Sequence, residues 1–177
     1  MSIHTMFRKT PVFLLLTFLI GAASLTAQAQ VKYGHMNLGN LLESLPDTKK
    51  ANDALKIFAD SLAIQDDTMT KLFQTQVAKY QADYQAGKLT PVQAQQIEAD
   101  LQKKQEEIQK FEQQAQQLVA VRRDALLKPI LTKIEAAVKS VAGENGYMMV
   151  FDTSSGAMLF ANETDDITAL VKKKLGL

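Results

Sequence analysis

The sequence predicts an α+β fold in which a long antiparallel α-helical hairpin, a coiled-coil-like arm, stands on a small β-sheet body. Three observations favour this fold class. Residues 40–142 contain a single glycine, Gly87, and are rich in Ala, Gln, Lys, Leu and Glu, which is a long-helix composition. Apolar residues within this stretch recur every three or four positions. Short apolar segments with the character of β-strands flank it on both sides.

The first 29 residues have the pattern of a secretory signal peptide. Two basic residues and no acid precede an apolar run at 12–20, and residues 27–29 read Ala-Gln-Ala, a small-x-small cleavage pattern. We therefore expect export and cleavage between Ala29 and Gln30. The alternative is an uncleaved membrane anchor, but the apolar run is far shorter than the ~20 residues that a spanning helix needs.

The exported chain is predicted to be nearly neutral. Without residues 1–29 it has 148 residues, of which 18 are basic and 19 acidic, so its net charge is −1. This balance argues against nucleic-acid binding, which requires a strong basic excess. The sequence has no Cys and thus no disulfide framework. No second apolar run of membrane-spanning length follows, so we expect no stable membrane insertion.

The segment before the hairpin is predicted to contribute to the body. Residues 31–36 favour a strand that carries Tyr33 and His35 on one face. Residues 38–45 favour a short helix, which Pro46 ends.

The hairpin is predicted to consist of helices over about 48–85 and 91–142. Between them, Gly87 suits the left-handed position after a helix, and Thr90 with Gln93 completes a capping box that starts the second helix. At ~1.5 Å per residue the helices reach roughly 57 and 78 Å, so we expect an arm too thin to bury a full core. The second helix is expected to contact the first through Ile97, Leu101, Ile108, Phe111, Ala115, Leu118 and Ala125, with Lys104 at an apolar-type position.

Pro129 lies inside the second helix, where the arm is predicted to join the body. It lacks a backbone N–H and crowds the preceding turn at a cost of ~3 kcal/mol, so we expect a kink there. The predicted organisation is a signal peptide over 1–29, a β-body and oligomerisation domain formed by 30–47 and 130–177, and an arm over 48–129.

The C-terminal part is predicted to complete the body. Residues 147–151 lack polar alternation, which predicts a strand in the middle of a covered sheet. Residues 158–161 are expected to return as a strand, and 167–175 to form a final helix capped by Asp165 or Asp166. Three strands of about five residues make a poor independent sheet, so we expect several copies to join through their strands.

Catalytic chemistry has almost no material in this sequence. The predicted exported chain has no Cys and one His, His35, which no neighbouring residue pattern places in a triad or a metal site. Phosphate-loop, zinc-protease and CxxC motifs are also missing from the sequence. We therefore expect a protein without enzymatic activity, cofactor or metal.

Four segments together resemble a known family. They are Val-Lys-Tyr-Gly-His-Met-Asn at 31–37, Leu-Lys-Pro-Ile at 127–130, Glu-Asn-Gly-Tyr-Met-Met-Val-Phe-Asp at 144–152, and Asp-Ile-Thr at 166–168. In this order, around a helical hairpin, they are similar to the Skp/OmpH family of periplasmic chaperones. The resemblance implies a jellyfish-like homotrimer in a Gram-negative periplasm, with three arms around a cavity. It also implies an ATP-independent holdase that binds unfolded outer-membrane proteins and prevents their aggregation before membrane insertion.

Two sets of residues follow as candidates. The oligomerisation body is expected to use Tyr33, Met149, Val150, Phe151, Leu159 and Phe160. The candidates for contact with unfolded proteins on the arm are Phe73, Val77, Tyr80, Tyr84, Ile108 and Phe111. We expect most of the second set to seal the two helices together, because an apolar stripe at helical spacing is usually a packing seam.

The arm departs from the resemblance in charge. Well-known members are strongly basic, whereas residues 48–142 carry 14 basic and 12 acidic residues. We therefore expect unfolded proteins to be held more by apolar contact than by charge. The same balance puts lipopolysaccharide binding in doubt. Two alternatives stay open: a coiled-coil envelope protein that binds one folded partner, and a periplasmic adaptor of an export system. An enzyme that uses His35 is the more distant one.

Overall fold

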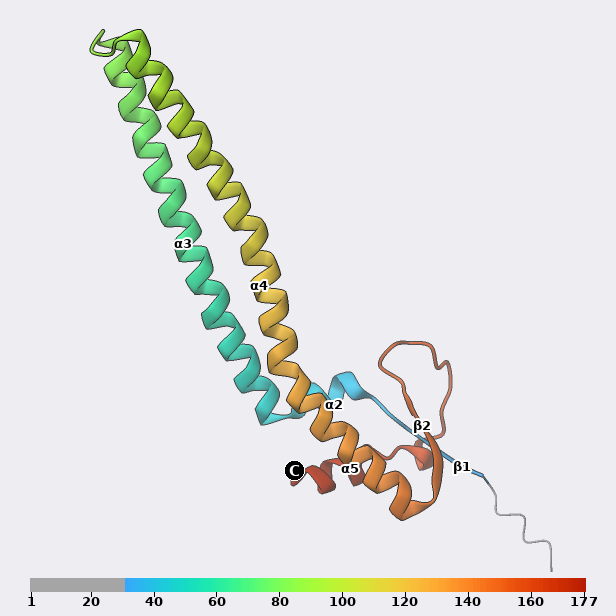
Figure 1. The fold of residues 1–177 in the computed structure, drawn as a ribbon. Coiled ribbons are helices and arrows are strands. Elements are labelled where there is room, and N and C mark those ends of the chain that lie inside the picture. Colours follow the sequence, from blue (N-terminus) through green and yellow to red (C-terminus); the bar gives the residue numbers. More distant parts are fainter. Residues whose placement is uncertain (1–30) are drawn as a thin grey trace, which may run out of the picture. The chain divides into compact units, whose positions relative to one another are not determined.

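The computed structural model describes residues 31–177, so the predicted signal peptide and its cleavage site at Ala29 and Gln30 lie outside the described residues. The elements are, in order, β1 (Lys32–Met36), α2 (Leu38–Ser44), α3 (Pro46–Gln85), α4 (Pro91–Asn145), β2 (Tyr147–Asp152), the 3-10 turn η2 (Glu163–Asp165) and α5 (Thr168–Leu175). Figure 1 shows the two long helices and the small elements at their base. The predicted α+β class, with long helices and a small sheet, is confirmed.

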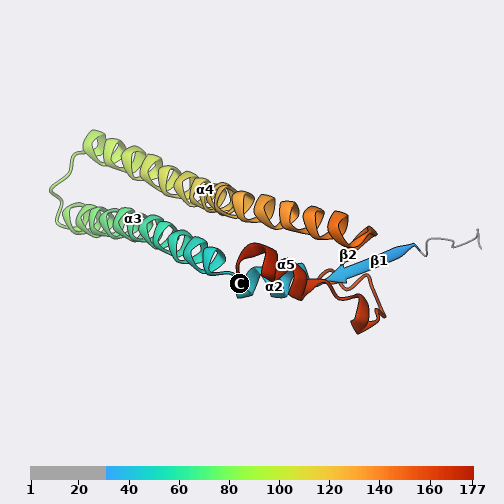
Figure 2. The ribbon, with the colours of Figure 1, turned by 90° about the horizontal axis from the view of Figure 1, so that it is seen from below.

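The arm consists of α3 and α4, which lie side by side in both views (Figures 1 and 2). With 40 and 55 residues they extend over about 60 and 82 Å. The turn between them has Gly87 in the left-handed conformation at φ 66°. The capping box forms as predicted: Thr90 N–H donates to Gln93 Oε1 at 2.9 Å, and Gln93 N–H donates to Thr90 Oγ1 at 3.4 Å.

The arm has almost no buried interior. Between residues 52 and 129, all of them described, Ala94 alone is buried, because two helices that meet along one stripe leave each seam side chain partly open to solvent. Near the base, the Lys133–Asp47 ion pair at 3.1 Å joins α4 to α3. Pro129 is exposed and α4 continues through it as one helix, so the kink at this position stays a prediction.

The hydrophobic core lies at the base of the arm. One face of α4 buries Ile130, Ile134, Ala137 and Val141, at the three- and four-residue steps of a helix, and packs against α5 and β2. The fully buried side chains at its centre are Leu41, Ile167 and Val171.

The sheet has two strands, β1 and β2, whose C-terminal ends lie side by side. Thr153 N–H, just after β2, donates to Met36 O at the end of β1 at 2.9 Å, so the two strands run parallel. Asp166 bridges His35 in the parallel sense, and Ile167 N–H donates to His35 O at 2.9 Å. As predicted, Tyr33 and His35 share the more exposed face of β1, while Gly34 and Met36 are buried on the other.

Three details of the body differ from the prediction. Residues 158–161 form no strand, and Asp166, later in the chain, takes the place beside β1. β2 is not in the middle of a covered sheet: among the described residues it pairs with β1 alone, and Met148 is 71% exposed. The last helix begins at Thr168, whose N–H donates to the Asp166 carboxylate at 2.7 Å, while Asp165 belongs to η2.

Candidate binding surfaces of the arm and the body

The candidate contact residues on the arm mostly lie on the seam between α3 and α4. Phe73, Val77, Tyr80, Ile108 and Phe111 are half-buried, whereas Tyr84 is 61% exposed. Phe73 and Ile108 line one small groove between the helices, together with Lys104.

Tyr80 closes the seam near the turn. Its hydroxyl donates to the Glu98 carboxylate of the opposite helix, and its ring lies 5.8 Å from the ring of Tyr84. The hydrogen bond to Glu98, with partial desolvation, raises the pKa of Tyr80 to about 12. The hydroxyl therefore stays protonated and the cross-helix bond persists throughout the neutral range.

A second set of apolar side chains lies off the seam. We call it the arm face, and its members are Ile57 (71% exposed), Ile64 (68%), Leu72 (59%), Leu118 (47%) and Val121 (61%). Scattered single apolar residues are ordinary on a protein surface, but several along two adjacent helices make an exposed apolar surface that is a candidate for binding.

The five residues of the arm face lie on one side and on the outer faces of the hairpin, away from the seam. Leu72 of α3 and Glu107 of α4 line the same groove, so these two residues lie on the same side of the hairpin. Leu118 follows Glu107 by 11 residues, about three turns of α4. Ile64 precedes Leu72 by eight residues, which is about 80° more than two full turns of α3, so its side chain points outward, away from the seam.

The sequence prediction places the apolar stripe of the second helix one residue early beyond Ala115, so it misses Leu118 as a residue of the arm face. Leu118 and Ala125, predicted for the seam, are exposed, and Val119 and Leu126 are half-buried in their place. In the structure, the next seam residue after Ala115 is Val119, four residues later. The heptad pattern instead predicts Leu118, three residues later. Apolar residues left outside the corrected stripe are the signal that identifies this surface.

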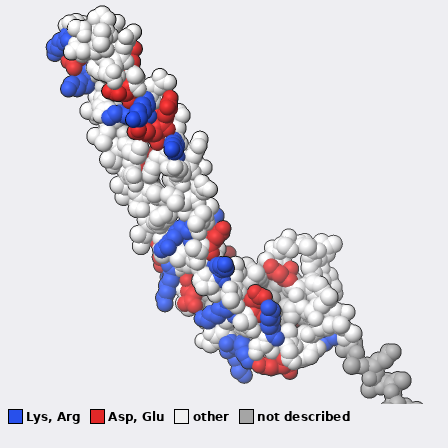
Figure 3. Space-filling view, viewed as in Figure 1, with Lys and Arg blue, Asp and Glu red and all other residues white. Residues whose placement is uncertain are grey.

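On the face that Figure 3 shows, charged side chains are sparse over the middle of the arm. In Figure 3 they gather near the turn and near the body, with an uncharged stretch over the middle of the helices. Most ion pairs of the arm are exposed i,i+4 pairs, such as Lys56–Asp60 and Lys71–Asp67, both at 2.6 Å. Such pairs contribute at most about 1 kcal/mol each. These ion pairs therefore add little to the stability of the arm.

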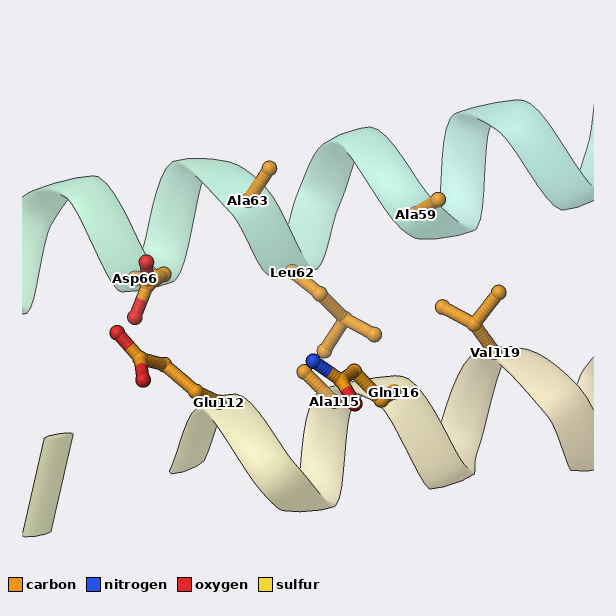
Figure 4. A pocket seen from close by; sticks show the side chains of 8 residues that line it. All are labelled: Ala59, Leu62, Ala63, Asp66, Glu112, Ala115, Gln116 and Val119. Atoms are coloured by element: carbon orange, nitrogen blue, oxygen red, sulfur yellow. The ribbon is translucent and has the colours of Figure 1, made fainter. Parts of the chain in front are cut away.

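The opposite side of the seam holds a shallow groove of about 450 Å³. Its apolar part includes Leu62, Ala115 and Val119, and we call it the acidic groove because Asp66 from α3 and Glu112 from α4 border it. Figure 4 shows the two carboxylates pointing toward each other across the gap between the helices. Asp66 Oδ1 is buried and has no hydrogen-bond partner.

The body carries the other exposed apolar surface. Met149 and Phe151 of β2 are 55% and 42% exposed, and Leu159 and Phe160 in the following loop are 98% and 85% exposed. Tyr33, 49% exposed, lies with its ring 6.3 Å from that of Phe151, while Val150 is half-buried. A groove of about 500 Å³ lies between α4 and β2, lined by apolar side chains from both.

Hydrogen bonds to carboxylates hold the sheet ends in place. Burial raises the pKa of Asp152, but the hydrogen bonds that it accepts from Ser154 and from Leu38 N–H together lower it by more. The net shift of this pKa is therefore downward. Burial likewise raises the pKa of Asp166, and the bonds from Thr168, with the nearby His35, lower it below the ordinary value. His35 itself is bonded through Nε2 to Asn162 O at 2.9 Å.

The part of the chain that the structure describes gathers no group of three or more His, Asp or Glu side chains able to hold a metal ion. None of the helices within residues 31–177 combines the length and the apolar character that crossing a membrane requires.

Known proteins share both the sequence and the fold of this chain. The family model "Outer membrane protein (OmpH-like)" matches residues 32–175. The chaperone protein Skp of Yersinia enterocolitica is 30% identical over 158 residues, which cover 87% of this chain and 91% of that protein. The chaperone protein Skp of Pectobacterium atrosepticum is 27% identical over 157 residues, or 89% and 93% of the two chains.

A solved structure from Caulobacter crescentus, described as an OmpH-like outer membrane chaperone, has a similar fold. It superposes with a TM-score of 0.70 over 82% of this chain and 83% of the other, at 17% identity, so this likeness concerns the fold alone. The family match covers nearly all of the described residues, and the sequence relatives agree with it. The chain belongs to the OmpH-like outer membrane protein family.

Proposed function

We propose that this protein is an ATP-independent periplasmic holdase that binds unfolded outer-membrane proteins and prevents their aggregation before they insert into the membrane. The observation that carries the proposal is the arm face, an apolar surface along two helices that have no core of their own to bury it. The relatives named as Skp chaperones support the same function.

The arm face suits an unfolded chain better than a folded partner. Its apolar side chains are spaced one or more helical turns apart and offer no deep pocket, so they do not demand a fixed shape in the ligand. Full burial of an apolar side chain contributes ~1.5–3 kcal/mol. Each contact is therefore weak, and retention depends on many contacts at once. Release needs no nucleotide, since membrane insertion offers the client a larger burial of apolar surface.

The protein acts as a homotrimer in this proposal, with the bodies joined and the arms free. The exposed side chains of β2 and its following loop, together with the groove beside α4, form a surface that a second copy would cover. A two-stranded sheet is marginal by itself, and strands from other copies would extend it. Several arms around one client also multiply weak contacts through a high effective concentration.

The function is tested by diluting a urea-unfolded outer-membrane β-barrel protein into buffer, with and without this protein, and following light scattering. We expect the scattering to be suppressed once the trimer is stoichiometric with the unfolded protein, in the absence of any nucleotide. Unchanged scattering at a molar excess of trimer would refute the holdase function. Binding of one folded partner, without effect on unfolded chains, would favour a structural envelope protein instead.

A further inference from the structure

The acidic groove is chemically incomplete in the arm as it stands. Asp66 Oδ1 is buried without a hydrogen-bond donor, and a buried acceptor left unpaired costs ~1–3 kcal/mol. Glu112 approaches from the opposite helix and brings a second negative charge in place of a donor (Figure 4). The site therefore lacks a group that carries both a positive charge and N–H donors.

The arm supplies no such group. Among the ion pairs formed within residues 31–177, neither Asp66 nor Glu112 takes part. The nearest acidic neighbour along α3, Asp67, is paired with Lys71 at 2.6 Å, so that lysine is already engaged. A cation at the groove has to come from outside this hairpin.

The rest of the groove fits the apolar part of a polypeptide. Leu62, Ala115 and Val119 form an apolar lining beside the carboxylates, and the small side chains of Ala59 and Ala63 let another chain approach α3 closely. A Lys or Arg side chain has the matching form, since its methylene stem packs on apolar surface while its charged end reaches the carboxylates.

We propose that the acidic groove binds unfolded segments in which a Lys or Arg lies among apolar residues, with the cationic end between Asp66 and Glu112. This inference rests on the proposed holdase function and adds a preference for basic segments to it. A nearly neutral arm has no long-range attraction for such segments, so the preference arises from this local pair of carboxylates.

The test uses two fluorescently labelled peptides of Leu, Ala and Ser that differ only in a central Lys or Glu. Anisotropy titrations with the protein purified after expression of the full chain measure both affinities. We expect the Lys peptide to bind about fivefold more tightly than the Glu peptide, because one charge pair near a solvated surface gives a preference of this size. The preference should shrink as salt is raised, because exposed charges are screened.

The variant Asp66→Asn/Glu112→Gln removes both charges while keeping the shape of the groove. We expect it to bind the two peptides equally. The matched control, Asp53→Asn/Asp124→Asn, makes the same change in net charge at exposed positions, one on each helix, and should keep the preference. Circular dichroism establishes that all three proteins keep their helices.

Several outcomes would overturn the inference. Equal affinity of wild type for both peptides, no binding of either, or a preference that survives in Asp66→Asn/Glu112→Gln would each do so. A variant that gains affinity for both peptides equally would show that the carboxylates only hold the helices apart. Suppressed aggregation in the light-scattering assay alongside any of these results would leave the holdase function intact and remove the groove's role alone.

Discussion

Gly34 is the position where the structure predicts the sharpest response to a single added methyl group. A Cβ at this residue would lie 3.0 Å from Ile167 Cγ2 and 3.1 and 3.2 Å from Cδ1 and Cε1 of Tyr147. Carbon atoms pack best at about 3.5–4.0 Å, so both neighbours must move. Ile167 is fully buried in the core and has little space to move into, while Tyr147 is partly buried and packs against the same core.

The magnitude follows from two opposing effects of Gly34→Ala. Overpacking of a tight core costs ~1–3 kcal/mol, and the loss of glycine's freedom in the unfolded chain returns ~0.4–1 kcal/mol. We expect a net loss of about 1–2 kcal/mol in the free energy of unfolding. Urea titration followed by circular dichroism, at one fixed protein concentration, measures it.

Gly143→Ala is the matched control for this prediction. Gly143 lies inside α4, and an added Cβ there meets nothing within 4 Å. The same chemical change should therefore stabilise the protein by ~0.5–1 kcal/mol. The reasoning is refuted if Gly34→Ala is as stable as wild type or if both variants shift in the same direction.

Three further predictions concern the core, the oligomer and acid stability. Ile134→Ala, at a side chain that is 3% exposed, should lower the free energy of unfolding by ~2–5 kcal/mol in urea titration; a loss under 1 kcal/mol would contradict the assigned core. Met149→Asp/Phe160→Asp should reduce the solution mass from trimer to monomer by light scattering coupled to chromatography, and an unchanged mass would place the interface elsewhere. Asp152 and Asp166 have pKa values below their ordinary 3.8, so their stabilisation is complete above that pH and is lost as the pH falls through the lowered values. Urea midpoints measured against pH should show this loss in wild type and a smaller one in Asp166→Asn.

The local signals of the arm could be predicted because each acts within a few residues. Gly87, Thr90 and Gln93 set the turn through backbone geometry and capping alone, and the helix starting at Pro91 follows from them. The scarcity of breakers between residues 40 and 142 made the length of both helices predictable in the same way.

The contacts between elements were harder to predict, since they depend on three-dimensional context. A heptad assignment that is one residue early places Leu118 on the seam. Only the structure shows that Val119, and not Leu118, is the half-buried residue there. The lack of polar alternation in β2 predicts a buried strand, but the described residues of the single chain leave Met148 71% exposed. The pairing of Asp66 with Glu112 has no signal in the sequence, because the two residues come from different helices.

Site-specific fluorescence tests whether unfolded clients contact the arm face. The chain has no cysteine, so Ile64→Cys and Val121→Cys each give a single site for an environment-sensitive dye, with Asp53→Cys as the exposed control. On addition of an unfolded outer-membrane barrel, we expect a blue shift at both arm-face sites, little change at Asp53→Cys, and no shift with the folded barrel. Suppressed aggregation with unchanged spectra at Ile64→Cys and Val121→Cys would contradict this expectation.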